Sequence, residues 1–220
     1  MARVGPIAPT AARAVALVVA GVTHPDAMSA VESIGERSGE HEAGRRAAAR
    51  AVAALGAGGG VSGLRGSRPS WPPGLVGSIS HTRGWATSVV ARSEHYGAVG
   101  LDLEVSRALP ADDAVAVCSA VEQSVFAGLG TGPERDAIAT LHWVAKEAAF
   151  KAWDPWCAGA LWGVNPALLG VEFSASGAVR AHADPELCDR LPGLPPLWGR
   201  WVDASGFVAV VLTAPPGPAR

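Results

Sequence analysis

The spacing of apolar residues predicts a chain that combines long helices with short strands. Apolar positions recur at helical intervals over residues 38–56 and again over 133–153. The first segment is rich in alanine and stops at Gly56, and the second stops before Pro155, because proline disfavours helix at the preceding residue. A third helix is expected over 110–127, where proline and two aspartates precede the apolar spacing.

Short apolar runs with β-branched residues indicate strands in both halves of the chain. The expected strands are 76–81, 85–91, 96–104, 169–174, 178–183, 197–202 and 206–213. Residues 82–84 and 174–177 are expected to form hairpin turns. The apolar run Ala14–Val22 is too short to span a bilayer, and we expect it to be the first buried strand.

The order of these elements predicts an α+β fold. Helix and strands in the first half are followed by helices and strands in the second, so we expect a pseudo-dimer of two similar lobes packed face to face. The N-terminal lobe is expected over residues 1–108 and the C-terminal lobe over 109–220. Small-molecule sites often form where two such units meet, so the cleft between the lobes is the expected site.

Composition narrows the classes of function. Of the 220 residues, 49% are apolar and 17% are charged, which is enough for a sizeable buried core. The net charge is −2 without a long basic run, which argues against a general nucleic-acid-binding protein. The three cysteines lie far apart, which argues against a zinc site or a disulfide framework. These features fit a cytoplasmic protein that does not enter a membrane.

The basic residues are divided unevenly between arginine and lysine. Sixteen of the 18 are arginine, and the two lysines, Lys146 and Lys151, lie on either side of Glu147. In a chain that uses arginine so freely, a retained lysine suggests a need for a compact, mobile ammonium group. Chance clustering is the alternative. Both lysines are therefore candidate functional residues.

A pair of acids on a predicted strand is the first candidate metal-binding feature. Asp102 and Glu104 lie two residues apart, and alternate residues of a strand project to the same side. Their Cα atoms would be roughly 6–7 Å apart, close enough for both carboxylates to bind one hard cation. The alternative is an ordinary strand end with solvated acids.

The predicted helix over 133–153 adds a third acid and a lysine. Glu147 and Lys151 are four residues apart and share one helix face. Alone they would form a routine ion pair worth a few tenths of a kcal/mol. If the helix meets the acidic strand, three carboxylates would instead form an oxygen-rich magnesium site that leaves positions for phosphate.

A small-residue strand after a proline-rich loop supplies candidate phosphate ligands. The segment runs from Arg68 through prolines and glycines to Ser80 and His81. Small residues allow a ligand to approach the backbone, and hydroxyl and imidazole groups can donate to phosphate. A core or hairpin histidine is the alternative for His81. A catalytic triad built on Ser80 is disfavoured, because no nucleophile-elbow pattern surrounds it.

Three motifs together resemble those of the 4′-phosphopantetheinyl transferase superfamily. They are GSISH at 77–81, VGLDLE at 99–104 and WVAKEAAFKAW at 143–153. The resemblance covers residues 25–175 and looks like the monomeric surfactin-synthetase and enterobactin-synthetase component D type. Arg37 and Arg45 match a family helix that carries arginines toward coenzyme A. Two departures are Trp-Val at 143–144, where the family commonly has Phe-Ser, and an irregular continuation at 154–170.

The resemblance implies an activity, a cofactor and a set of site residues. The implied enzyme moves phosphopantetheine from coenzyme A to a serine of an apo acyl or peptidyl carrier protein, which is an acidic helical domain, and releases 3′,5′-ADP. It would work as a monomer. Asp102, Glu104 and Glu147 would hold Mg²⁺. The implied coenzyme A-binding residues are Arg37, Arg45, Arg68, Ser80, His81, Asp102, Lys146 and Lys151.

The implied chemistry gives catalytic roles to Glu147 and Lys151. The carrier serine would attack the β-phosphorus, and either Glu147 or a water on the metal ion would take its proton. Lys151 would stabilise or protonate the departing phosphate. The carrier could belong to a fatty-acid, polyketide or nonribosomal-peptide pathway.

Other interpretations use the same residues. A metal-dependent phosphohydrolase could cleave a nucleotide or coenzyme A pyrophosphate with the same acids. A non-catalytic coenzyme A-binding protein is a third reading, and the intact acids and both lysines argue against it. Trp153, Trp156 and Trp162 either belong to the core or form part of an apolar surface for the carrier.

Overall fold

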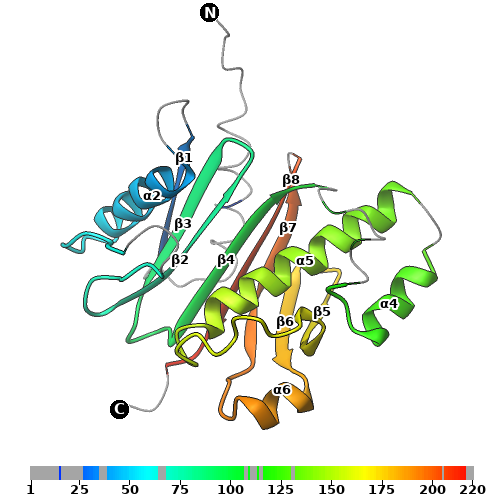
Figure 1. Ribbon diagram of the computed structural model, residues 1–220. Coiled ribbons are helices and arrows are strands. Elements are labelled where there is room, and N and C mark those ends of the chain that lie inside the picture. The colour runs from blue at the N-terminus through cyan, green and yellow to red at the C-terminus, as the bar shows by residue number, and fades with distance from the viewer. Residues whose placement is uncertain are drawn as a thin grey trace, which may run out of the picture.

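The chain forms two antiparallel sheets with helices packed against them (Figure 1). The computed structural model describes residues 15, 27–34, 39–63, 68–106, 109, 113, 116–129, 132–204 and 206–216. The expected α+β class is confirmed. Among the helices that the structure describes, none is long and apolar enough to cross a membrane.

The first sheet contains the predicted hairpin. Its strands lie in the order β1 (Ala27–Ser33), β3 (Trp85–Arg92) and β2 (Leu75–Thr82). Helix α2 (Glu40–Ala54) lies against this sheet through a buried stripe of small residues (Figure 1). The approach is close, because a β-carbon at Gly44 would lie only 2.8 Å from Ile79 of β2.

The second sheet carries the long helix. Its strands lie in the order β4 (Ala98–Val105), β8 (Phe207–Ala214), β7 (Leu197–Ala204), β6 (Ala178–Ala183) and β5 (Leu169–Phe173). Helix α5 (Pro133–Trp153) packs across β4 and β8 and buries Val144, Ala148 and Trp153 (Figure 1). The shorter elements are α4 (Ala120–Ala127), the 3₁₀ helix η1 (Pro166–Leu168) and α6 (Pro185–Arg190).

The two sheets meet where β2 runs beside β4, a line that we call the seam (Figure 1). Side chains join the two strands, since Ser80 donates a hydrogen bond to Asp102 and Thr82 donates one to Glu104. β4 is hydrogen-bonded to β8 and therefore belongs to the second sheet, although we expected it in the N-terminal lobe. The division of the chain into two similar lobes stays a prediction.

Most predicted elements are confirmed, and α5 has both of its predicted ends. Of the third predicted helix, α4 covers Ala120–Ala127 and begins after Ser119, which forms a reciprocal capping box with Glu122. Before it, Asp113 is helical and residues 116–117 form a turn, while the rest of 110–115 lies outside the described residues. Of the run Ala14–Val22 only Val15 is described, and there the backbone is helical and the side chain buried. The strand prediction is wrong at that position, because a short apolar run suits a buried helix as well as a buried strand.

The close contact between α5 and β4 depends on Gly100. A β-carbon at this position would overlap the carbonyl oxygen of Ala148 and lie 2.8 Å from the Ala152 nitrogen. We expect Gly100→Ala to lower the free energy of unfolding by about 3 kcal/mol or more in urea denaturation. Gly58→Ala is the control, since nothing lies within 4 Å of its added β-carbon. Equal stability of the two variants would contradict the close contact.

Candidate active site

The acids of β4 and one face of α5 meet in a cleft of about 310 Å³. Its lining residues are Ile79, Ser80, His81, Asp102, Leu103, Glu104, Trp143, Glu147 and Lys151. They come in threes from β2, β4 and α5, which are distant in the sequence. The structure therefore brings the three predicted acids and Lys151 to one cleft at the seam.

Asp102 is the centre of the polar network in this cleft. Its Oδ1 atom accepts hydrogen bonds from the Lys151 ammonium and the Ser80 hydroxyl, both at 2.6 Å. The Ser80 oxygen in turn accepts a hydrogen bond from the Leu103 amide at 3.2 Å. Lys151 thus forms its ion pair with Asp102 of the adjacent strand β4, whereas the four-residue spacing had pointed to Glu147 on the same helix.

Glu104 is oriented in the same way as Asp102, by a hydroxyl group of β2. Its Oε1 atom accepts from Thr82 and from the Val105 amide, the latter at 2.7 Å. Thr82 was not among the predicted site residues. A signal did exist, because Ser78, Ser80 and Thr82 alternate along β2 and all three are buried on one face. Alternating buried hydroxyls indicate a polar partner opposite that face.

Glu147 has a raised pKa, and its surroundings explain the direction. Burial is the largest cause and raises the pKa, the Lys151 ammonium lowers it, and the charge of Asp102 raises it. A carboxylate with a raised pKa accepts a proton more readily near neutral pH. Among the acids of the cleft, Glu147 is therefore well suited to act as a base.

The donor set of the cleft fits a magnesium ion that arrives with phosphate. Asp102, Glu104 and Glu147 offer only oxygen, which Mg²⁺ prefers, and Mg²⁺ is usually held by one or two carboxylates plus substrate phosphates. Within the described residues, no three His, Cys, Asp or Glu side chains lie close enough together to hold a metal ion. The expected three-carboxylate cluster is thus not preformed, and Asp102 Oδ1 instead accepts a hydrogen bond from Lys151.

Four of the predicted coenzyme A-binding residues line the cleft, namely Asp102 and Lys151 together with Ser80 and His81, and others lie away from it. Ser80 and His81 line the cleft, and His81 is half-exposed with Nδ1 3.5 Å from Glu40 Oε2. Arg45 donates to backbone carbonyls of the loop after α2, at Ser62 and Gly63. Burial lowers the pKa of Arg45. Arg37 lies outside the described residues.

Arg68 connects the loop before β2 to the end of α5. Its guanidinium makes a two-point contact with Asp154, with Nη2 3.1 Å from Oδ1 and Nε bonded to Oδ2. Asp154 directly follows the last residue of α5 and is buried. Sequence reasoning missed Asp154, because the pairing joins residues 86 positions apart and has no local signal.

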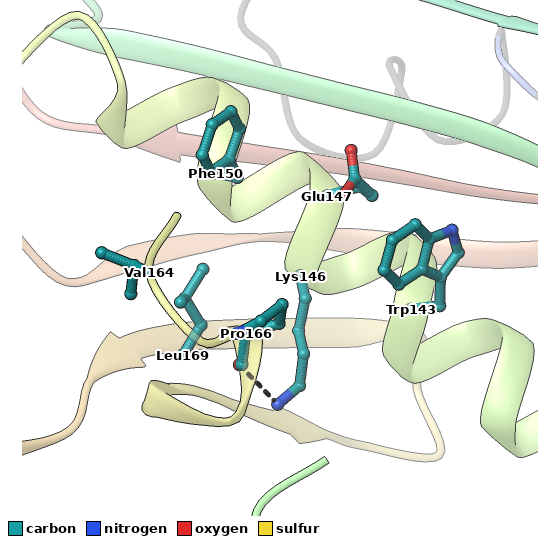
Figure 2. A pocket seen from close by; sticks show the side chains of 7 residues that line it. All are labelled: Trp143, Lys146, Glu147, Phe150, Val164, Pro166 and Leu169. Atoms are coloured by element: carbon teal, nitrogen blue, oxygen red, sulfur yellow. Dashed lines mark hydrogen bonds between the residues drawn. The ribbon is translucent and has the colours of Figure 1, made fainter. Parts of the chain in front are cut away.

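The prediction that Lys146 contacts phosphate is corrected by the structure. Its side chain is 2% exposed, and its ammonium donates to Glu122 Oε2 at 2.7 Å and to the Pro166 carbonyl at 3.1 Å. Figure 2 shows that Lys146 and Glu147 leave α5 in different directions. Consecutive helical residues point roughly 100° apart, so the neighbour of a cleft residue faces elsewhere.

The tryptophans divide between the core and the surface. Trp153 is fully buried and donates to the Pro195 carbonyl, so it is a core residue and cannot form part of a docking surface. Trp156 packs partly buried against the same core, whereas Trp162 is 68% exposed. Trp143 lines the cleft beside Glu147.

Two protein-family models match the sequence over most of the described fold. The 4′-phosphopantetheinyl transferase N-terminal domain matches residues 23–91, and the 4′-phosphopantetheinyl transferase superfamily matches residues 98–191. The chain belongs to the 4′-phosphopantetheinyl transferase superfamily. The second match contains all of β4 and α5, so it includes the four residues Asp102, Glu104, Glu147 and Lys151 of the cleft.

The chain matches three relatives in this superfamily over about half to two thirds of their length. The chain is 33% identical to 4′-phosphopantetheinyl transferase Svp of Streptomyces mobaraensis over 174 residues, 73% of the chain and 65% of the relative. It is 33% identical to 4′-phosphopantetheinyl transferase PptT of Mycobacterium tuberculosis over 155 residues, which are 66% of the chain and 65% of the relative. It is 35% identical to enterobactin synthase component D of Salmonella typhi over 120 residues, which are 53% of the chain and 48% of the relative. The chain thus spans 65% of the length of the first two relatives.

Proposed function

We propose that this protein is a magnesium-dependent 4′-phosphopantetheinyl transferase that modifies a serine of an apo carrier protein. The observation that carries the proposal is the cleft in which Asp102, Glu104, Glu147 and Lys151 meet. Three acids and one ammonium suit a reaction that moves a phosphoryl-linked group, because the acids can hold a cation and the ammonium can neutralise phosphate. Membership of the superfamily and the names of its relatives support the same activity.

Asp102, Glu104 and Glu147 would hold Mg²⁺, which would neutralise the pyrophosphate of coenzyme A. The hydroxyls of Ser80 and Thr82 keep the two β4 acids turned toward the cleft. Ser80 and His81 are the cleft residues of β2 that we assign to the phosphates. We assign Arg37, Arg45 and Arg68 to the end of coenzyme A that carries the 3′-phosphate and the adenosine. A guanidinium group suits this role because it can bind a phosphate through two hydrogen bonds.

The proposed reaction exchanges one phosphorus–oxygen bond for another. The carrier serine oxygen bonds to the β-phosphorus of coenzyme A, the bond from that phosphorus to the bridging oxygen breaks, and 3′,5′-ADP leaves. Glu147 accepts the serine proton from its place in the cleft, one helical turn before Lys151. Lys151 neutralises the charge that develops on the leaving phosphate. Its exposed fraction of 26% leaves the ammonium accessible from the cleft.

The proposed enzyme acts as a monomer. β2, β4 and α5 of a single chain supply every residue that lines the cleft, so a second copy is not required to complete it. Light scattering during gel filtration should give the mass of one chain at assay concentration. A stable dimer would contradict this part of the proposal without affecting the transfer chemistry.

The proposal predicts a mass gain on the carrier. The protein is incubated with coenzyme A, Mg²⁺ and a panel of apo carriers from fatty-acid, polyketide and nonribosomal-peptide systems, and each carrier is weighed by mass spectrometry. We expect a gain of one phosphopantetheine group on at least one carrier, lost when EDTA removes the metal and when the carrier serine is replaced by alanine. Breakdown of coenzyme A without any carrier gain would favour a pyrophosphohydrolase instead.

A further inference from the structure

Lys146 is buried, charged and absent from the proposed chemistry. It is one of only two lysines in the chain and precedes Glu147 directly. Desolvating an ammonium group is costly unless it is paired and hydrogen-bonded. A charged residue that is buried beside α5 at that cost is expected to have a structural or functional role.

The partner of Lys146 is itself fixed from several sides. Glu122 Oε2 accepts from the Lys146 ammonium and from the Ser119 amide, each at 2.7 Å. Glu122 Oε1 accepts from the Val171 amide at 3.2 Å. Lys146 also donates to the Pro166 carbonyl. One ion pair therefore joins the start of α4, the middle of α5, η1 and the edge strand β5.

The ion pair lies on a different side of α5 from the cleft. In Figure 2 the Lys146 side chain extends toward Pro166, while the Glu147 carboxylate points away from it. Only a small pocket, of about 30 Å³, lies between α5 and residues 164–169. On the other side Gly100 lets the helix backbone touch β4.

We propose that Lys146 is a positioning residue: its buried pair with Glu122 fixes the rotation of α5 about its own axis and so holds Glu147 and Lys151 in the cleft. The contact at Gly100 sets how close the helix lies to the sheet. A rotation of α5 would pull the Lys146 ammonium from Glu122 and leave two buried charges unpaired. This inference rests on the proposed transferase function for its kinetic test.

A double-mutant cycle separates positioning from direct contact with substrate. The variants are Lys146→Met, Glu122→Gln and the double variant. Each replacement is similar in volume to the original side chain, and in the double variant neither charge remains. Each single variant leaves one buried charge unpaired, so we expect a melting temperature lower by roughly 10 °C. At 15 °C, where the variants are folded, kcat of Lys146→Met should fall by about 10- to 100-fold while KM for coenzyme A changes less than about threefold.

Glu122→Gln and the double variant decide the proposal. If Lys146 acts through Glu122, removing both charges should restore most of the melting temperature, because no buried charge is left unpaired. The kcat of Glu122→Gln and of the double variant should be about as low as that of Lys146→Met, because each of them lacks the pair that positions α5. A folded Glu122→Gln with wild-type kcat would mean that the ammonium acts without its partner, and would overturn the proposal. Wild-type kcat in Lys146→Met, or a double variant that does not fold, would overturn it as well.

The exposed pair of α6 serves as the matched control. Arg190 and Glu186 lie 3.9 Å apart and both side chains are more than half exposed, so Arg190→Met with Glu186→Gln should change neither the melting temperature nor kcat. The wild-type assay keeps the two hypotheses apart. If wild type transfers nothing to any carrier, the proposed function fails, whereas the cycle of melting temperatures still reports whether the buried pair is coupled.

Discussion

Lys151→Ala is expected to lower kcat by about 10²- to 10³-fold with coenzyme A and carrier both saturating. The ammonium is held at the cleft by Asp102 Oδ1, 2.6 Å away, and by its position one turn after Glu147. A charge–charge contact near 4 Å is worth about 4 kcal/mol at an effective dielectric of about 20, and each factor of ten in rate corresponds to about 1.4 kcal/mol. Loss of the ammonium removes that stabilisation from the leaving phosphate.

Lys151→Arg should recover only part of the lost activity. The guanidinium keeps the charge, but it is planar and larger than an ammonium, and it must fit beside Asp102 and Ser80 in a site shaped for a compact group. The measurement is the steady-state rate of holo-carrier formation by wild type, Lys151→Ala and Lys151→Arg. Arg190→Ala, which removes an exposed cation far along the chain, is the control and should keep the wild-type rate. Near wild-type turnover of Lys151→Ala would remove the proposed role.

Local signals in the sequence were sufficient for the elements that position the site. α5 follows its predicted bounds because apolar periodicity, Pro133 at the start and Pro155 beyond the end agree with one another. The hairpin of β2 and β3 follows from two β-rich runs around a short turn at Arg83-Gly84. The acids of β4 were found because strand alternation places Asp102 and Glu104 on one side.

The contacts that join these elements were beyond local reasoning. Lys151 had two possible acidic partners, and only the packing of α5 on β4 selects Asp102 over the neighbour on its own helix. Lys146 seemed a phosphate ligand beside Glu147, yet its partner is 24 residues away on another helix. β1 was missed because Ala27–Ser33 alternates weakly, with small residues on both sides. α6 was missed despite a cap at Asp184, because six residues show little periodicity.

Glu147→Gln is expected to abolish most of the activity, by about 10³-fold, while making the metal-free protein more stable at neutral pH. Glutamine keeps the volume and one oxygen but cannot take a proton or carry a charge to a cation. The control is Glu134→Gln in the exposed first turn of the same helix, which should leave kcat unchanged. Wild-type kcat in Glu147→Gln would exclude it as the base.

The sign of the stability change follows from the raised pKa of Glu147, for which burial is the main cause. A carboxyl group whose pKa is higher in the folded than in the unfolded state stabilises the fold below its unfolded pKa of about 4.3, and this contribution is lost as the pH rises through the folded pKa. Glutamine never ionises and so avoids that loss. In thermal melts with EDTA, Glu147→Gln should melt above wild type at pH 7, and the difference should shrink toward pH 4.

Added Mg²⁺ should then raise the melting temperature of wild type more than that of the variant, because only wild type offers all three carboxylates. A variant that melts below wild type at pH 7 in EDTA would mean that burial does not disfavour the Glu147 carboxylate, and the argument for it as the base would lose its physical ground.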